Sequence, residues 1–144
     1  MSIIYGKSEA CQLTTVKKLL DSAHLPFEDI DAHFQNYIVA SSEGAAIGAI
    51  GVECHKSDGL LRSFVVDESY RGKGIGKELL ERLMTLARSL DISALFLLTT
   101  TASDYFSSHG FSALGRDDLP ETIKRTKEFA DICPVSAIYM VMRI

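Results

Sequence analysis

The sequence predicts an α/β fold with a mixed central sheet of about seven strands flanked by helices, and three observations support this prediction. A buried strand at residues 60–66 leads into a glycine-rich turn, and a helix with apolar residues at helical spacing follows up to Leu90. The apolar run 94–98 is typical of a central strand, buried on both faces and parallel to the strand before the helix. Upstream, strand patterns at 36–40 and 45–54 flank a turn and predict a hairpin.

The remaining elements follow in chain order. Residues 2–5 predict a short first strand, 10–23 an amphipathic helix, and 27–34 a short helix or an acidic loop. Gly48 and Gly51 lie inside the strand 45–54, where glycine indicates close packing or a bend. We expect a turn at 56–59, a short helix at 102–109 with a strand from Phe111, a helix from the capped start 117–120 through 123–129, and a final strand at 135–144.

Length and composition limit the class of protein. The 144 residues suit one domain over residues 1–144, and 47% hydrophobic with 24% charged residues is typical of a soluble globular protein. A net charge of −4 argues against nucleic acid as a partner, because such binding relies on basic clusters. The apolar run 45–52 is too short to span a bilayer and the start resembles no leader, so we expect a cytoplasmic protein without a membrane partner.

The cysteines give no sign of a disulfide framework or a metal site. Cys11, Cys54 and Cys133 are odd in number and show no C-x-x-C spacing. We therefore expect buried, reduced thiols and no metal.

The glycine-rich turn Arg71-Gly72-Lys73-Gly74-Ile75-Gly76 predicts a phosphate site. The start of a helix offers backbone N–H groups without internal partners and a partial positive charge, and glycines let a phosphate approach them. Arg71, Lys73 and Lys77 add positive charge, so the predicted ligand is a polyphosphate. The alternative is a plain flexible turn before a surface helix. The spacing fits neither a Walker A loop, which requires Gly-Lys-Ser/Thr, nor the Gly-x-Gly-x-x-Gly dinucleotide fingerprint.

This loop resembles the Gln/Arg-x-x-Gly-x-Gly/Ala loop of the Gcn5-related N-acetyltransferases, which cradles the pyrophosphate of acetyl-CoA. The order of the elements resembles that fold over nearly the whole chain. Shorter segments at 62–66, 97–101, 119–123 and 133–137 look like the branch of arsenic-resistance N-acetyltransferases, which itself resembles the catalytic domain of amino-acid (glutamate) N-acetyltransferases. The resemblance implies acetyl-CoA as cosubstrate and a small amino acid, or an analogue carrying arsenic or phosphorus, as the amine.

The resemblance also implies which residues hold the cosubstrate. Backbone groups of the strand end are expected to bond the pantetheine arm and the thioester oxygen, and the loop to bind the diphosphate. These cofactor-binding residues are Phe64, Val65, Val66, Arg71, Gly72, Lys73, Gly74, Ile75, Gly76 and Lys77.

Acyl transfer to an amine needs a base, and a proton for the leaving thiolate. Glu53 is the first candidate for the base and His55 the second, because alternation places both on one face at the end of a strand; a solvated strand-end pair is the alternative. For the acid, many family members carry a tyrosine where this chain has Phe106. Tyr105 is one residue earlier, about 100° around a helix, so it is a weak candidate and packing is its alternative role.

Arginine matches a substrate carboxylate, and Arg62 interrupts an apolar strand beside the predicted thioester position, with Ser63 next to it. Its alternative is a structural ion pair with an internal Asp or Glu. Arg125 is a second candidate for binding the substrate carboxylate, and its alternative is a place on a solvated helix face. Thr99 and Thr100 are candidates for donating hydrogen bonds to substrate or cofactor, and their alternative is merely to end the strand.

The predicted function is transfer of an acetyl group to the amine of a small amino acid by direct attack in a ternary complex. The alternatives are a protein- or polyamine-directed N-acetyltransferase and a catalytically lapsed CoA-binding module. A homodimer formed through the final strand is a further possibility.

Overall fold

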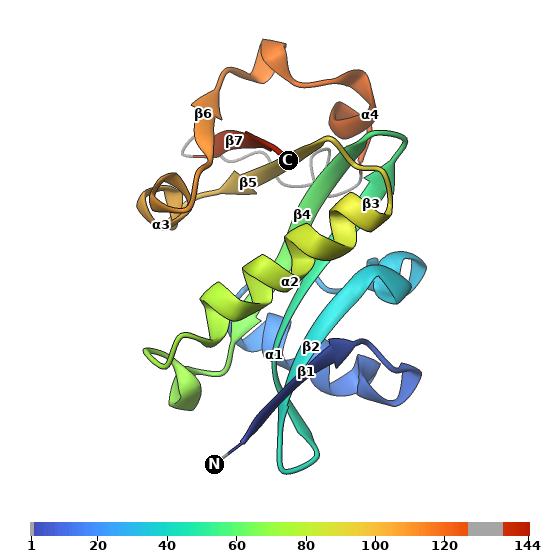
Figure 1. The fold of residues 1–144 in the computed structure, drawn as a ribbon, viewed down its shortest axis with the longest axis vertical. Helices are drawn as coiled ribbons and strands as arrows, with labels where there is room; N and C mark the ends of the chain where they lie inside the picture. The colour runs from blue at the N-terminus through green and yellow to red at the C-terminus, as the bar shows by residue number, and fades with distance from the viewer. Residues whose placement is uncertain (1, 127–136) are drawn as a thin grey trace. The chain divides into compact units, whose positions relative to one another are not determined.

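The computed structural model describes residues 2–126 and 137–144 (Figure 1). Seven strands form one sheet in the order β1-β2-β3-β4-β5-β7-β6, which confirms the predicted mixed sheet flanked by helices. The described residues divide into two compact units, residues 2–53 with 62–86, and residues 54–61 with 87–126 and 137–144. Each is described by itself.

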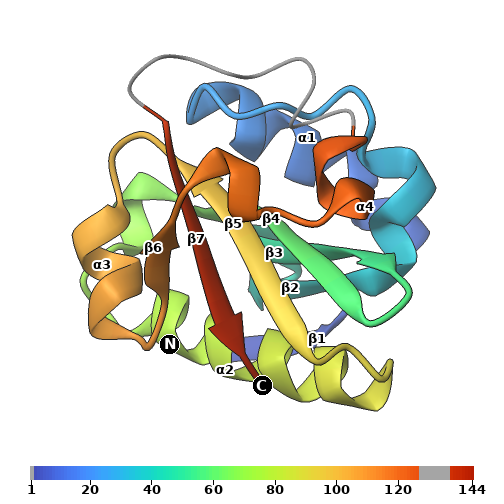
Figure 2. The ribbon, with the colours of Figure 1, turned by 90° about the horizontal axis from the view of Figure 1, so that it is seen from above.

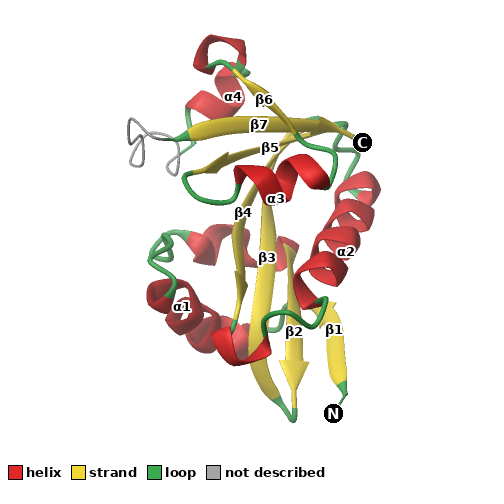
Figure 3. Ribbon diagram, turned by 90° about the vertical axis from the view of Figure 1, so that its left-hand side faces the viewer, coloured by secondary structure: helices red, strands yellow, loops and turns green. Residues whose placement is uncertain are grey.

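The first unit contains the amino-terminal strands and the helices on both of their faces. Its elements are β1 Ile3–Lys7, the 3-10 helix Ala10–Gln12, α1 Leu13–Ser22, the 3-10 helix η2 Ile30–Asn36, β2 Tyr37–Ser42, most of β3 Ala45–His55, the end of β4 Asp58–Val66, the 3-10 helix Glu68–Tyr70 and most of α2 Ile75–Ser89. Strands β1, β2 and β3 pair antiparallel. Helices α1 and α2 cover opposite faces of β2 and β3 (Figure 3).

The core of this unit explains the sequence pattern. Val16 and Leu20 of α1 are fully buried against Ile30 and Tyr37. Gly51 lies opposite Tyr37, and a Cβ at Gly51 would come within 2.1 Å of the Tyr37 ring, so this glycine is needed for close packing, as predicted. Gly48 is also tightly packed, with Val65 O at 3.2 Å from the position of a Cβ.

The second unit contains the parallel strand pair. Asp58 to Leu60 of β4 pair parallel with β5 Ala94–Thr99, as the apolar run predicted. β7 Ile138–Arg143 lies between β5 and β6 Ser112–Leu114 and is antiparallel to both (Figure 2). Helix α3 Ser103–Ser108 precedes β6, and α4 Glu121–Lys124 packs Ile123 on Leu60 and Phe96.

Three predicted boundaries are wrong. The turn at 56–59 is shorter, because Lys56 adopts a positive φ of 59° and the chain is extended again from Asp58. Helix α4 begins at Glu121, because Pro120 at its N-cap is extended (ψ 150°), and residues 116–118 form a separate 3-10 helix. The final strand begins at Ile138, later than predicted; the expected helix residues 127–129 and strand residues 135–136 lie outside the described residues.

The cysteines differ from expectation in their burial. Cys11 and Cys54 are free thiols, as predicted, but both are exposed, and Cys133 lies outside the described residues. Within residues 2–126 and 137–144, no helix is long and apolar enough to cross a bilayer, and no three His, Cys, Asp or Glu side chains are grouped to hold a metal ion.

Candidate active site

The phosphate loop, defined as residues 71–77, contains two glycines in a backbone conformation that favours glycine. Gly72 and Gly74 have φ of 81° and 80°, in the left-handed region that residues with a Cβ rarely adopt. A Cβ at either position would meet no atom within 4 Å, so the backbone rather than packing requires glycine there. Helix α2 begins directly after, at Ile75, and its first amides have no partners inside the helix.

The side chains of the loop include one buried isoleucine and three exposed cations. Ile75 is 2% exposed and fixes the start of α2 in the core. Arg71, Lys73 and Lys77 are exposed. Arg71 Nε donates to Val66 O at 3.2 Å, and Lys73 Nζ lies 5.4 Å from the Tyr70 ring centroid. The loop therefore presents amides and three cations to solvent at one helix start, which is an arrangement suited to an anion.

A cleft of about 250 Å³ lies between the end of α1 and the end of β4. Val65, Val66 and Arg71, three of the predicted cosubstrate residues, line it. Phe64, the fourth predicted strand residue, is half-buried in β4. The other lining residues are Leu19, Ser22, Ala23, Asp67 and Glu68. The end of β4 thus borders a space adjoining the loop, as cosubstrate binding along this strand would require.

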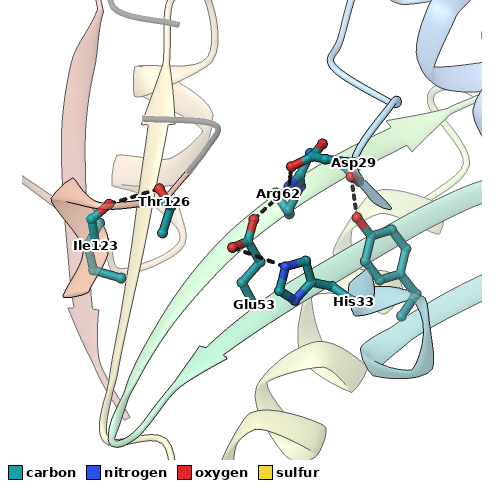
Figure 4. A network of polar contacts seen from close by, with 8 residues as sticks. Asp29, His33, Glu53, Arg62, Ile123 and Thr126 are labelled. Atoms are coloured by element: carbon teal, nitrogen blue, oxygen red, sulfur yellow. Dashed lines mark hydrogen bonds and ion pairs between the residues drawn. The ribbon is translucent and has the colours of Figure 1, made fainter. Parts of the chain in front are cut away.

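Four charged or titratable side chains form a network that we call the Arg62 cluster: Asp29, His33, Glu53 and Arg62 (Figure 4). The Arg62 side chain is fully buried and binds Asp29 through two nitrogens, each 2.7 Å from a carboxylate oxygen. Its Nη1 also lies 2.6 Å from Glu53 Oε2. His33 Nε2 lies 3.4 Å from the other oxygen, Glu53 Oε1.

The Arg62 cluster gives the buried Arg62 two anionic partners, and its predicted role toward a substrate carboxylate stays a prediction. Its guanidinium binds two internal carboxylates, which is the structural ion pair that the sequence left as the alternative to substrate binding. The hydrogen bond from Arg62 holds the pKa of the Asp29 carboxyl below its usual value. With one cation and two carboxylates, the cluster carries an excess negative charge whenever His33 is neutral.

Glu53 is buried, contrary to the solvated strand-end alternative. Its side chain is 3% exposed, and Arg62 and His33 contact different oxygens of its carboxylate. His55, the second candidate, is the last residue of β3 and is half-buried. Sequence reasoning missed Asp29 and His33, although both fall in the segment 27–34 that was left as a helix or acidic loop. The need of a buried Arg62 for an anionic partner was the signal that could have pointed to Asp29.

Ser63 interrupts the regular backbone of β4. It has a φ of 59°, and a left-handed conformation in a residue with a Cβ costs about 1–2 kcal/mol. Its buried hydroxyl lies 2.6 Å from the Tyr37 hydroxyl. Ser63 thus sits in a buried polar contact beside Arg62, and its predicted role toward substrate stays a prediction.

The aromatic pair on α3 explains the departure at the tyrosine position. Phe106 is 6% exposed and packs edge-on against Phe111, with ring centroids 5.5 Å apart. Tyr105 is 36% exposed and stacks on His109 at 4.3 Å. Burial raises the pKa of the Tyr105 phenol, which keeps it protonated to higher pH. A protonated phenol can still donate a proton. The role of Tyr105 as the acid therefore stays a prediction.

The other predicted substrate residues lie at element ends in the second unit. Thr99 Oγ1 accepts a hydrogen bond from the Ala102 amide at 3.0 Å and so supports the start of α3. Thr100 is exposed in the bend after β5. Arg125 is exposed at the end of α4, which also suits the solvated helix face that was its alternative.

Known proteins resemble this chain in sequence. A family model described as an acetyltransferase (GNAT) domain matches residues 33–113. An amino-acid acetyltransferase of Pseudomonas putida is 33% identical over 95 residues, which cover 65% of this chain and 22% of that protein. An amino-acid acetyltransferase of Neisseria meningitidis is 26% identical over 104 residues, which cover 71% of this chain and 24% of that protein. The matched region therefore spans under a quarter of the length of these curated relatives.

Solved structures share the fold. N-acetylglutamate synthase from Neisseria gonorrhoeae, complexed with coenzyme A and N-acetyl-glutamate, has a TM-score of 0.85 at 20% identity and covers 99% of this chain and 35% of its own. Rv2747 from Mycobacterium tuberculosis, solved in complex with CoA, has a TM-score of 0.82 at 21% identity. The alignment covers 98% of this chain and 99% of the Rv2747 chain.

Proposed function

The chain belongs to the acetyltransferase (GNAT) domain family, and on this premise we propose that it transfers the acetyl group of acetyl-CoA to the amine of a small amino acid or amino-acid analogue. The observation that carries the proposal is the phosphate loop, whose left-handed Gly72 and Gly74 open the start of α2 beside the cleft lined by Val65 and Val66. We further propose that residues 1–144 act as one acetyltransferase domain.

In the proposed reaction the amine attacks the thioester directly in a ternary complex. The loop amides and cations hold the diphosphate, and backbone groups of Phe64 to Val66 hold the pantetheine arm and the thioester oxygen. The amine nitrogen forms a bond to the carbonyl carbon, the carbon–sulfur bond breaks, and CoA leaves as a thiolate that takes up a proton. The nitrogen loses its proton to Glu53, directly or through water.

The Arg62 cluster supports Glu53 as the base. A carboxylate fixed by Arg62 has a defined orientation, and burial excludes the solvent that would otherwise compete for it. Arg62 is a positioning residue in this mechanism, because it binds Glu53 and Asp29. Arg125 is the other candidate for a substrate carboxylate.

Amino-acid acetyltransferases among the relatives support an amino acid as the substrate. The resemblance to the arsenic-resistance branch keeps analogues carrying arsenic or phosphorus among the candidates. The excess negative charge of the Arg62 cluster favours a second candidate, a polyamine or a protein amine, whose cationic groups such a cluster attracts.

The test is thiol release from acetyl-CoA in the presence of an amine panel. The panel contains glutamate and other amino acids, a phosphorus-containing amino-acid analogue, spermidine and a peptide with a free amine, and a chromogenic thiol reagent reports product. Amine-dependent release supports the proposal and ranks the substrates. Calorimetric binding of CoA without release across the panel supports a lapsed CoA-binding module instead, and the absence of any CoA binding contradicts the whole proposal.

A further inference from the structure

His33 connects the buried base to solvent. Glu53 is 3% exposed, whereas the side chain of His33, which contacts Glu53 Oε1 through Nε2 at 3.4 Å, is 29% exposed. His33 lies on η2, which leads into β2, and Glu53 lies near the end of β3. Figure 4 shows the imidazole against the Glu53 carboxylate, at the oxygen that Arg62 does not bind.

A proton taken up by a buried Glu53 must leave before the next turnover. Arg62 cannot accept it, because a guanidinium has no acceptor and stays protonated. Asp29 contacts the cluster through Arg62, with both of its carboxylate oxygens 2.7 Å from guanidinium nitrogens, so a proton from Glu53 would have to pass Arg62 to reach it. A neutral imidazole has one unprotonated ring nitrogen, which can accept a proton and later release it.

We propose that His33 carries the proton from Glu53 to solvent in each turnover. The inference rests on the proposed function, with Glu53 as the base. In the step, the O–H bond of protonated Glu53 breaks as an N–H bond forms at His33 Nε2, and the imidazolium then gives a proton to water or buffer. Glu53 returns to a carboxylate and His33 to neutral imidazole, so protons and charge balance over one cycle. His33 does not touch the reacting atoms and acts through Glu53.

Charged groups around His33 fit this role. Glu53 of β3 and Asp29, ahead of η2, both stabilise the imidazolium that forms transiently, whereas Arg62 of β4 opposes it and is offset by these two carboxylates. On η2 itself, Asp31 is paired at 2.7 Å with Lys17 of α1. Among these five groups, negative charges outnumber positive ones by three to two, which favours the imidazolium.

The experiment compares wild type with His33→Ala at saturating acetyl-CoA and amine. We expect kcat to fall on the order of tenfold, less than the 10²- to 10⁴-fold that loss of a general base itself produces, with the KM for acetyl-CoA unchanged. Added imidazole should restore kcat of His33→Ala in proportion to its concentration at fixed pH and ionic strength. It should not affect wild type.

Controls separate this role from a structural one. His24→Asn replaces an exposed histidine with positive φ by a residue that tolerates that conformation, and it should keep wild-type kcat. His33→Gln keeps a polar side chain and should be slow and also respond to imidazole. Wild-type kcat in His33→Ala, or a loss in both variants that imidazole does not restore while CoA still binds, overturns the inference. If wild type itself transfers no acetyl group, the proposed function fails instead.

Discussion

The phosphate loop offers backbone amides at a helix start, whereas the Arg62 cluster consists of side chains from three separate segments of the chain. The loop lies within seven consecutive residues, and its geometry follows from two left-handed glycines and one helix start. The cluster joins Arg62 to Asp29, 33 positions away, and to Glu53, nine positions away. Under the proposed function, binding in the loop therefore depends on conformation, and chemistry in the cluster depends on charge.

That difference predicts separable defects: loop variants should weaken binding of CoA, and cluster variants should slow turnover or unfold the protein.

The largest effect is expected for Glu53→Gln. The amide keeps the size of the side chain but removes the base, so kcat should fall about 10²- to 10⁴-fold, with CoA affinity by calorimetry unchanged. Glu81→Gln, on the exposed face of α2, is the matched control and should behave as wild type. Unchanged kcat in Glu53→Gln would remove this residue from the mechanism.

Arg62→Met tests the charge balance of the cluster through stability. Removing the buried cation leaves Asp29 and Glu53 facing each other without compensation, which should lower the free energy of unfolding by about 3–5 kcal/mol in urea titrations. Arg82→Met is the control, because its ion pair with Glu78 is about half exposed and should contribute under about 1 kcal/mol. Equal losses in the two variants would mean that burial of Arg62 is not what makes its ion pairs important.

Gly74→Val should weaken CoA binding and leave turnover intact, which is the opposite of the effect expected for Glu53→Gln. A β-branched residue at a φ of 80° is strained by about 1–2 kcal/mol, and relaxation of the loop would move the α2 amides away from a diphosphate. We expect the Kd for CoA to rise about tenfold, since 1.4 kcal/mol corresponds to that factor, with kcat retained at saturating acetyl-CoA. Gly44→Val carries a matched strain, at a φ of 83° with open space around it, but lies in the β2–β3 turn. If Gly44→Val weakens CoA binding as much, the loop has no special role.

The same contrast explains what the sequence could predict. The loop, the parallel pair of β4 and β5, and the close packing at Gly51 follow from local spacing and residue type, and the structure confirms the last two. It also shows that two glycines of the loop are left-handed. The partners of Arg62 could not be chosen, because no local pattern says which distant carboxylate a buried arginine meets. His33 gave no signal, since its role depends on the Glu53 contact made only after folding. The roles of the cosubstrate, catalytic and substrate residues stay predictions.

The smallest effect is expected from the pH dependence of the Asp29–Arg62 pair. Arg62 lowers the folded-state pKa of Asp29, so the pair's contribution to stability is fully present above the unfolded pKa of about 3.9 and is lost as pH falls through the lower folded pKa. The urea midpoint of wild type should therefore exceed that of Asp29→Asn near pH 6, and the difference should shrink below pH about 4. Because the Asp29 side chain is 18% exposed, part of its interaction is screened, and the effect should be smaller than that of Arg62→Met. Asp21→Asn, an exposed site on α1, should leave the midpoint unchanged at both pH values. A difference between wild type and Asp29→Asn that grows as pH falls would contradict the direction of the pKa change, and with it the view that Arg62 binds Asp29 as a carboxylate.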